Sequence, residues 1–298
     1  MRGRIGRLAL AAAVSALAGV PAAATERPPI VGVAHIAFHV SDLAKARAFY
    51  GGLLGYEEVY HLGDAARPER VCFKINDRQL VCVLPGLPPG QADRLSHVAF
   101  ETTDVAALRA YLEEKGVKAG EVGTDAGGDR FVRTMDADGH AVDFVQYQPG
   151  SLMSAARGTR LGAPRISSRL LHVGLTVADV AAADRLYKDA LGFSEIWRGG
   201  RTDTQTDWIN MKVPDGTDYL EYMLVTGPVD RDRLGSAHHM ALLVPDIQAA
   251  LETVRARPGG QDPKAVRTPQ VGRNKRWQLN LFDPDGSRTE LMEPFTMR

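Results

Sequence analysis

The sequence predicts an α+β protein of two tandem domains, each built from a pair of modules in which one strand is followed by a helix and three further strands. The first observation is an internal repeat: AHIAFHVSDLAKARAFY, from Ala34, matches LHVGLTVADVAAADRLY, from Leu171. A second match joins the segment that begins at Ser96 to the one at His238, and a third joins DADGHAVDFVQ to DPDGSRTELME. Since each half of the chain carries the pattern twice, we expect four modules.

Helix signals follow the first strand of each half. Asp42 and Asp179 stand where an N-cap residue belongs, and Gly55 and Gly192 stand where a helix ends. Between Asp42 and Gly55 the apolar residues follow the three-four spacing of an amphipathic helix of about a dozen residues. These apolar residues are Leu43, Ala46, Phe49, Tyr50, Leu53 and Leu54.

The repeat also sets the expected domain boundaries. An N-terminal domain spans residues 30–148, a linker spans 149–168, and a C-terminal domain spans 169–296. The linker contains Ser, Gly and Arg, and we expect a short helix in it from Leu152. A chain of 298 residues that is 44% hydrophobic can bury a sizeable core, which favours two domains.

Residues 1–24 read as a signal peptide. Three arginines in the first seven residues precede an apolar stretch, Leu8 to Val20, that is too short to span a bilayer. Small residues then offer a cleavage site after Ala24. We therefore expect a periplasmic or secreted protein without stable membrane association after cleavage, and an uncleaved membrane anchor is the alternative.

The balance of basic and acidic residues argues against nucleic acid as a binding partner. The chain has 36 basic and 36 acidic residues, and no basic stripe points to nucleic acid. A small-molecule substrate is therefore the expected partner. A homodimer is left open, because the sequence carries no signal for the oligomeric state.

Two cysteines flank an expected hairpin turn. Cys72 and Cys82 lie on either side of Asn76-Asp77-Arg78, and a three-residue loop would place them opposite each other. Export would permit a disulfide between them. A register shift of one residue would instead leave two separate buried thiols, and the sequence does not decide between these outcomes.

Four polar residues of the C-terminal half stand in apolar strand patterns: His172, Glu221, His239 and Glu290. Each is embedded in a period of two, so each should project from one face of a sheet. Packing against helices does not require a His or Glu at these positions, and a buried carboxylate without a partner is costly. Two imidazoles and two carboxylates that converge would make a site for a divalent metal such as Zn, Ni, Co, Mn or Fe(II).

The repeat motifs resemble those of the vicinal oxygen chelate superfamily, which includes glyoxalase I, extradiol dioxygenases and bleomycin-binding proteins. The motifs are HxxxxVxD at His35–Asp42 and His172–Asp179, the Leu-Gly-aromatic helix ends, and DPDGxxxEL at Asp283–Leu291. The resemblance implies that paired modules form a cupped, mostly antiparallel sheet. It also implies that His172, Glu221, His239 and Glu290 occupy the four metal-ligand positions of bacterial-type glyoxalase I. With His172, His239 and Glu290 alone, the set is similar to that of extradiol dioxygenases.

The N-terminal domain keeps part of the same set. His35, His97 and Asp143 fall on matching positions and form a candidate second metal site. Val81 or a neighbour occupies the position that matches Glu221, and Asp is one methylene shorter than Glu, so this second site is the weaker candidate. Two other histidines are expected to be exposed: His140 and His238.

Three functions follow from these residues. The first is a glyoxalase-like lyase or isomerase in which Glu221 or Glu290 is the catalytic base. The substrate would carry vicinal oxygens, but export argues against glyoxalase I itself, whose substrate needs a cytosolic thiol. The second is an extradiol-type Fe(II) dioxygenase. Against it, TPQVGRNKRWQLNLFDPDG lacks the second-sphere His and Tyr of that family, although Lys275 or Arg276 could donate a proton.

The third function is a non-catalytic protein that binds an antibiotic or another aromatic compound. Aromatic residues that could line its pocket are Trp208, Tyr219, Tyr222 and Trp277. Tyr222 falls on the core-facing side of its strand, so ordinary packing is expected there. Four potential ligands on one face argue for a metal enzyme instead.

Overall fold

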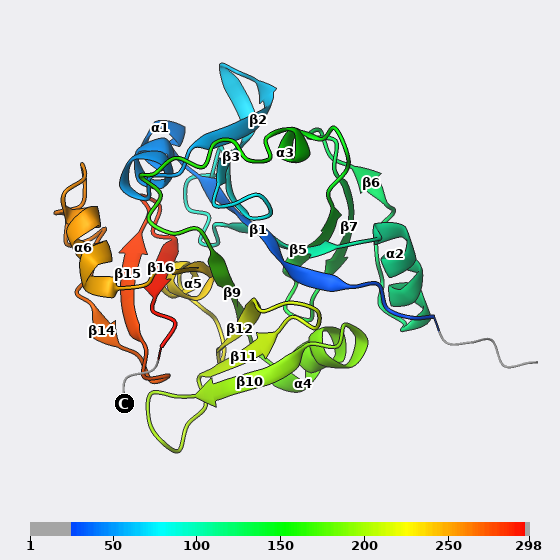
Figure 1. Ribbon diagram of the computed structural model, residues 1–298. Helices are drawn as coiled ribbons and strands as arrows, with labels where there is room; N and C mark the ends of the chain where they lie inside the picture. Colours follow the sequence, from blue (N-terminus) through cyan, green and yellow to red (C-terminus); the bar gives the residue numbers. More distant parts are fainter. Residues whose placement is uncertain (1–24, 296–298) are drawn as a thin grey trace, which may run out of the picture.

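The computed structural model describes residues 25–295, so the predicted signal peptide, residues 1–24, lies outside the described part of the chain. The chain forms two eight-stranded sheets that correspond to the two halves of the repeat (Figure 1). Among the described residues, no helix is long and apolar enough to cross a membrane. The predicted α+β class with two tandem domains is confirmed.

The N-terminal sheet has the strand order β2-β3-β4-β1-β5-β8-β7-β6. Its strands are β1 (Ile30–Val40), β2 (Glu58–Asp64), β3 (Arg67–Lys74), β4 (Leu80–Pro85), β5 (Leu95–Thr102), β6 (Gly123–Thr124), β7 (Arg130–Met135) and β8 (Ala141–Gln146). The first strand of each module pairs with its last strand in parallel, β1 with β4 and β5 with β8, while β1 and β5 pair antiparallel. The first and last strands of both modules therefore meet at the middle of the sheet.

The C-terminal sheet repeats this arrangement with the order β10-β11-β12-β9-β13-β16-β15-β14. Its strands are β9 (Leu170–Val177), β10 (Ser194–Gly199), β11 (Trp208–Lys212), β12 (Tyr219–Leu224), β13 (His239–Leu243), β14 (Gln270–Val271), β15 (Trp277–Phe282) and β16 (Arg288–Met292). Again β9 pairs parallel with β12, β13 pairs parallel with β16, and β9 and β13 pair antiparallel. All four predicted modules are present.

The helices lie between the strands of the modules and in the connections. They are α1 (Leu43–Arg47), η1 (Ala48–Leu53), α2 (Val105–Glu114), α3 (Leu152–Ala155), α4 (Val180–Asp184), η2 (Arg185–Ala190), α5 (Arg231–Ala237) and α6 (Ile247–Arg255). The short linker helix expected from Leu152 is α3. Helix α5, which precedes β13, was not expected from the sequence.

The predicted helix ends are confirmed. The Asp42 carboxylate accepts a hydrogen bond from the Lys45 backbone, and Asp179 caps α4 in the same way. Gly55 and Gly192 adopt φ values of 77° and 81°, a left-handed conformation that ends the helix. The helix after the first strand of each domain differs from the expectation in one respect: its second half, η1 or η2, is a π-helix.

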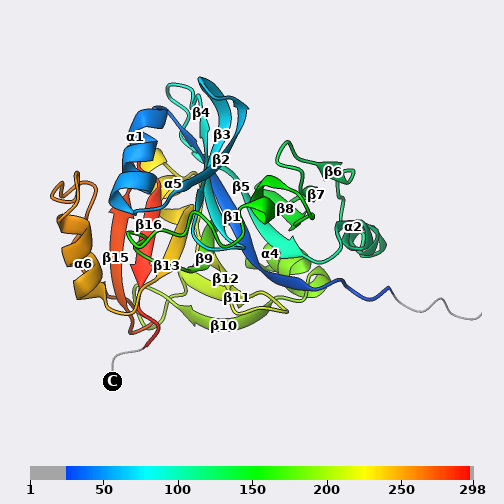
Figure 2. The ribbon, with the colours of Figure 1, turned by 45° about the horizontal axis from the view of Figure 1, so that its top comes forward.

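The two domains share one hydrophobic core. A single cluster of buried residues includes side chains from both sheets and from α1, η1, α4 and η2. The Tyr50 hydroxyl of η1 donates to Asp283 of the other domain over 3.0 Å, and Tyr187 of η2 donates to Asp136 over 3.1 Å. Figure 2 shows α1 beside β15 and β16. Each domain therefore covers part of the core of the other.

This shared interface contradicts the prediction that His140 and His238 are exposed, since their exposed fractions are 8% and 2%. The Thr176 hydroxyl lies 3.1 Å from His140 Nε2 and 3.0 Å from His238 Nε2, so it links the two rings. Asp136 contacts His140 Nδ1 and Asp93 contacts His238 Nδ1, both over 2.8 Å. The prediction was wrong because the alternation within one strand does not reveal which surfaces the other domain covers.

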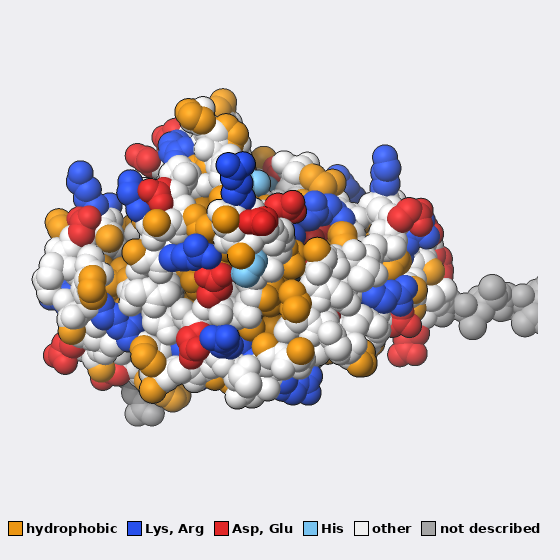
Figure 3. Space-filling model, turned by 90° about the horizontal axis from the view of Figure 1, so that it is seen from above, with side chains coloured by type: hydrophobic (Ala, Val, Ile, Leu, Met, Phe, Trp, Pro, Cys, Tyr) orange, Lys and Arg blue, Asp and Glu red, His pale blue; other side chains and the backbone are white. Residues whose placement is uncertain are grey.

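The two cysteines form a disulfide. Cys72 on β3 lies directly opposite Cys82 on β4, as the three-residue loop predicts, and the two sulfur atoms are bonded. On the face shown in Figure 3, basic and acidic side chains are interspersed without a continuous basic surface. This face therefore offers no broad positive patch of the kind that nucleic acid requires.

Candidate metal centre

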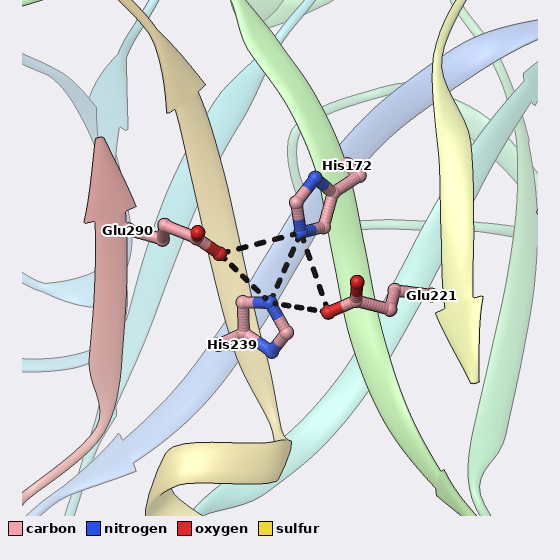
Figure 4. Close-up of side chains that lie close together, drawn as sticks. All are labelled: His172, Glu221, His239 and Glu290. Carbon is pink, nitrogen blue, oxygen red and sulfur yellow. Dashed lines mark hydrogen bonds and ion pairs between the residues drawn. The ribbon is translucent and has the colours of Figure 1, made fainter. Parts of the chain in front are cut away.

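The four candidate ligands lie on four adjacent strands of the C-terminal sheet. His172 lies on β9, Glu221 on β12, His239 on β13 and Glu290 on β16. These strands are neighbours in the order β12-β9-β13-β16. Since all four side chains leave the same face, the curl of the sheet directs them toward one point (Figure 4).

The ligand atoms of these residues lie close together. The two histidine Nε2 atoms are 3.0 Å apart. Glu221 Oε2 lies 3.8 Å from His172 Nε2 and 3.4 Å from His239 Nε2, and Glu290 Oε2 lies 3.7 and 3.6 Å from the same atoms. Within residues 25–295, this is the one group of at least three His, Cys, Asp or Glu residues arranged to hold a metal.

Local packing holds both imidazoles in place. His239 Nδ1 lies 2.8 Å from the Ala237 carbonyl oxygen, so Nδ1 carries the proton and the Nε2 lone pair faces the centre. The His172 ring stacks on Tyr219 with 4.4 Å between ring centroids. Gly174 on β9 pairs with His239 on β13, and a Cβ atom at Gly174 would be 2.1 Å from two atoms of the His239 ring. Only glycine lets the β9 backbone approach the ring this closely.

Burial sets the charges of the site. It lowers the pKa of His172 and of His239 well below the usual value, which keeps both rings neutral and able to bind a metal. The pKa of Glu290 is raised to about 7: burial is the main cause, Arg288 opposes the shift, and the charge of Glu221 adds to it. Two buried carboxylates side by side repel each other, and a divalent cation would remove this repulsion.

The donor set fits a divalent transition metal. Two neutral imidazole nitrogens and two carboxylate oxygens suit Zn, Ni, Co, Mn or Fe(II), and no amine or guanidinium nitrogen lies among them. His172, Glu221, His239 and Glu290 are therefore able to hold such an ion.

A cavity of about 430 Å³ opens above this group. Glu221 and Glu290 form part of its wall, together with Trp197, Trp208 and Arg288. Strands β14 and β15 and the neighbouring loops also contribute polar groups to the cavity wall: Arg201, Gln270, Arg273, Asn274, Gln278 and Asn280. The cavity can hold a small molecule in contact with both carboxylates.

The aromatic residues and the lysine singled out in the sequence differ in their surroundings. Trp208 lines the cavity, whereas Trp277 packs against the core. Tyr222 is buried, as predicted, and Tyr219 supports His172. Lys275 is exposed. The sequence reasoning missed Trp197 and Arg288, although Arg288 stands two residues before Glu290 on the same strand and therefore on the same face.

The corresponding residues of the N-terminal domain are arranged differently. His35 and His97 again face each other, with 2.9 Å between their Nε2 atoms. Both oxygens of Asp143, however, accept hydrogen bonds from Arg133, over 2.6 and 2.8 Å. Cys82 pairs with Ala37 on the neighbouring strand, as Glu221 pairs with Gly174 in the other domain. Cys82 therefore stands at the position that corresponds to Glu221, and its disulfide takes the place of the fourth candidate ligand.

Linker helix α3 closes this N-terminal cup. Met153 packs against Ala37, Cys72 and Cys82 in a separate buried cluster. The structure therefore leaves His35, His97 and Asp143 one donor short, with the carboxylate engaged elsewhere. This geometry argues against a second metal site.

The chain thus has two cupped sheets, and the central strands of one of them carry four candidate metal ligands. Comparison with known proteins identifies the family. A profile of the Glyoxalase/Bleomycin resistance protein/Dioxygenase superfamily matches residues 32–144 and 169–291. The chain belongs to this superfamily. No curated protein matches the chain.

Several extradiol dioxygenases of known structure share this fold. Homoprotocatechuate 2,3-dioxygenase from Arthrobacter globiformis is 22% identical, with a TM-score of 0.66, over 92% of this chain and 83% of that one. The same enzyme from Brevibacterium fuscum, in complex with 3,4-dihydroxyphenylacetate, is 22% identical over the same shares, with a TM-score of 0.65. The 2,3-dioxygenase LapB from Pseudomonas sp. KL28 is 16% identical, with a TM-score of 0.64, over 90% of this chain and 93% of that one. At these identities the likeness shows the fold alone.

Proposed function

We propose that the protein is a metal-dependent enzyme that binds two neighbouring oxygens of a small aromatic substrate, and that it cleaves the ring as extradiol dioxygenases do. The observation that carries the proposal is the buried group of two His and two Glu in the wall of a cavity with two tryptophans. The solved structures named above support the dioxygenase chemistry over the lyase chemistry that the ligand motif alone favours.

In this proposal His172, His239 and Glu290 hold the ion on one side. Their neutral imidazoles and one carboxylate match the two-His-one-carboxylate set that leaves open positions for substrate and dioxygen. Bound Fe(II) would supply Lewis acidity and the redox chemistry that dioxygen requires. Trp197 and Trp208 in the cavity wall offer flat apolar surface to an aromatic ring.

Glu221 takes the role of the catalytic base. It lines the cavity, its side chain is 11% exposed compared with 3% for Glu290, and it lies on the far side of the histidine pair from Glu290. From there its carboxylate can accept a proton from a substrate hydroxyl. Glu221 would thus provide a proton acceptor in a site whose final segment lacks the second-sphere His and Tyr of the extradiol enzymes.

A glyoxalase-like lyase or isomerase is the second candidate. It is favoured by the distances of Glu221, which is as close to the histidine pair as Glu290 is. With Glu221 as a fourth ligand, either carboxylate could loosen and remove a proton from a carbon next to an oxygen. The two candidates differ in whether dioxygen is consumed.

We also propose that the protein works outside the cytoplasm. The disulfide between Cys72 and Cys82 supports this, because such bonds persist in oxidising compartments. Fractionation of the native host cells tests the proposal: the mature chain should appear in the periplasm or the medium without residues 1–24.

Oxygen uptake on the Fe(II)-loaded protein tests the enzyme proposal. With catechol and with 3,4-dihydroxybenzoate, we expect consumption of one dioxygen per ring cleaved and a yellow ring-opened product. Glu221→Gln should lower kcat by about 100-fold or more, since it removes a general base. No oxygen uptake with any catechol, together with metal-dependent proton exchange on an α-hydroxy ketone, would favour the lyase or isomerase. Binding without turnover in either assay would leave a binding protein.

A further inference from the structure

One cation in the cavity wall lacks a partner. Arg288 lies two residues before Glu290 on β16, is half-buried, and lines the cavity beside the metal-ligand group. The only hydrogen bond from its guanidinium to a described residue is a long one, 3.5 Å from Nη1 to Asn280 Oδ1. Nε and Nη2 are shielded from solvent and have no partner. A buried charge without compensation is costly, so an anion in the cavity would stabilise it.

Other arginines of the chain show what this group binds when a carboxylate is near. Arg47 donates to Glu58, Arg133 to Asp143 and Arg198 to Glu195, each through Nε and Nη2 to the two carboxylate oxygens. This two-point geometry is the strongest pairing of an arginine with a carboxylate. At Arg288 no described carboxylate fills that role.

The other two arginines that line the cavity each form an ion pair with an aspartate. Arg201 pairs with Asp207 over 2.7 Å and lies over the Trp208 ring. Arg273 pairs with Asp203 across the loops at the cavity mouth. Since Glu221 and Glu290 would balance a divalent ion, Arg288 leaves the cavity with one uncompensated positive charge.

We propose that Arg288 binds a carboxylate group of the substrate, which is therefore an aromatic acid with two neighbouring hydroxyls. This inference rests on the proposed function, because it assigns the second end of the same substrate. The ring would lie along Trp197 and Trp208, its oxygens toward the metal group and its carboxylate toward Arg288. Only the long hydrogen bond to Asn280 holds the guanidinium, so a turn of the side chain would bring the shielded Nε and Nη2 to the anion.

Three probes separate the two parts of this claim: catechol, 3,4-dihydroxybenzoate, which adds the carboxylate, and benzoate, which lacks the hydroxyls. Binding to the metal-loaded full chain is measured by calorimetry without oxygen. We expect the wild type to bind 3,4-dihydroxybenzoate roughly 10- to 100-fold more tightly than catechol, as a charge-assisted pair provides. Arg288→Gln should abolish this preference and leave catechol affinity unchanged. Arg267→Gln, at an arginine that stacks on Phe282 outside this cavity, should keep it.

The possible outcomes distinguish the inference from the proposed function. Tight catechol binding without any gain from the carboxylate would overturn the role of Arg288 and leave the function standing. Binding of benzoate that depends on Arg288, with no binding of catechol, would support the carboxylate site and reject the function. Weaker metal binding in Arg288→Gln, with the acid preference intact, would show that Arg288 only stabilises the ionised Glu290. Absence of binding by all three probes would reject both.

Discussion

Replacement of Gly174 by alanine should weaken metal binding without changing a ligand. The new Cβ would lie 2.1 Å from His239 Cε1 and Nδ1 and 2.8 Å from the Ala237 carbonyl oxygen. Non-bonded carbon atoms need about 3.5 Å, so the ring must retreat by roughly 1.4 Å. That movement breaks the hydrogen bond from His239 Nδ1 to Ala237 and draws Nε2 out of the group.

The expected loss is about 10- to 100-fold in metal affinity, as for other changes that disturb the support of a metal ligand. The free energy of unfolding of the metal-free protein should fall by about 1–3 kcal/mol, the usual cost of overpacking. Gly52→Ala is the matched control, because no atom lies within 4 Å of its added Cβ. This control should bind metal as the wild type does.

Cobalt titration provides the assay. The Co²⁺ absorption bands report the ligand geometry, and competition with a chromophoric chelator gives the dissociation constant. Urea unfolding of each metal-free protein shows whether the variant is folded. If Gly174→Ala binds Co²⁺ with wild-type affinity and an unchanged spectrum, then His239 does not coordinate the ion from the position described here.

Three further predictions concern the rest of the fold. Burial raises the pKa of Asp283 from 3.8 to about 6 in the folded protein. Because the folded pKa is higher than the unfolded one, protonation of Asp283 adds about 3 kcal/mol to the free energy of unfolding below about pH 4. This contribution is lost as the pH rises above about 6. Asp283→Asn should remove this pH dependence in urea unfolding, and an unchanged pH profile would contradict it. Cys72→Ser/Cys82→Ser should lower the free energy of unfolding by about 2–4 kcal/mol without changing metal content; a loss of metal would implicate the N-terminal cup. Residues 25–148 expressed alone should bind a hydrophobic dye and unfold without cooperativity, whereas a sharp thermal transition would show that this domain does not need the shared core.

The sequence was sufficient to predict the repeat-based features. The capping by Asp42 and Asp179, the helix ends at Gly55 and Gly192, and the four modules all follow from local patterns that recur along the chain. A recurring pattern fixes the strand on which each residue lies. Because strands alternate in side-chain direction, it also fixes the face, which is why four candidate ligands could be placed on one surface.

Features that depend on contacts between modules could not be predicted in this way. The burial of His140 and His238 results from the packing of one domain on the other, which no single strand pattern records. The equivalence of Cys82 and Glu221 depends on strand register, and the sequence match left it uncertain by a residue. Arg288 was missed because an arginine on a strand gives no sign of the cavity it lines or of the partners it lacks.

Metal content per chain tests the central claim most directly. Mature protein would be reconstituted with Fe(II) or Zn²⁺, freed of excess metal and analysed by elemental mass spectrometry, beside His172→Ala/His239→Ala and His35→Ala/His97→Ala. We expect one ion per chain in the wild type and in the His35→Ala/His97→Ala variant, and none in the His172→Ala/His239→Ala variant. No bound ion in the wild type, or an ion that persists without His172 and His239, would contradict it.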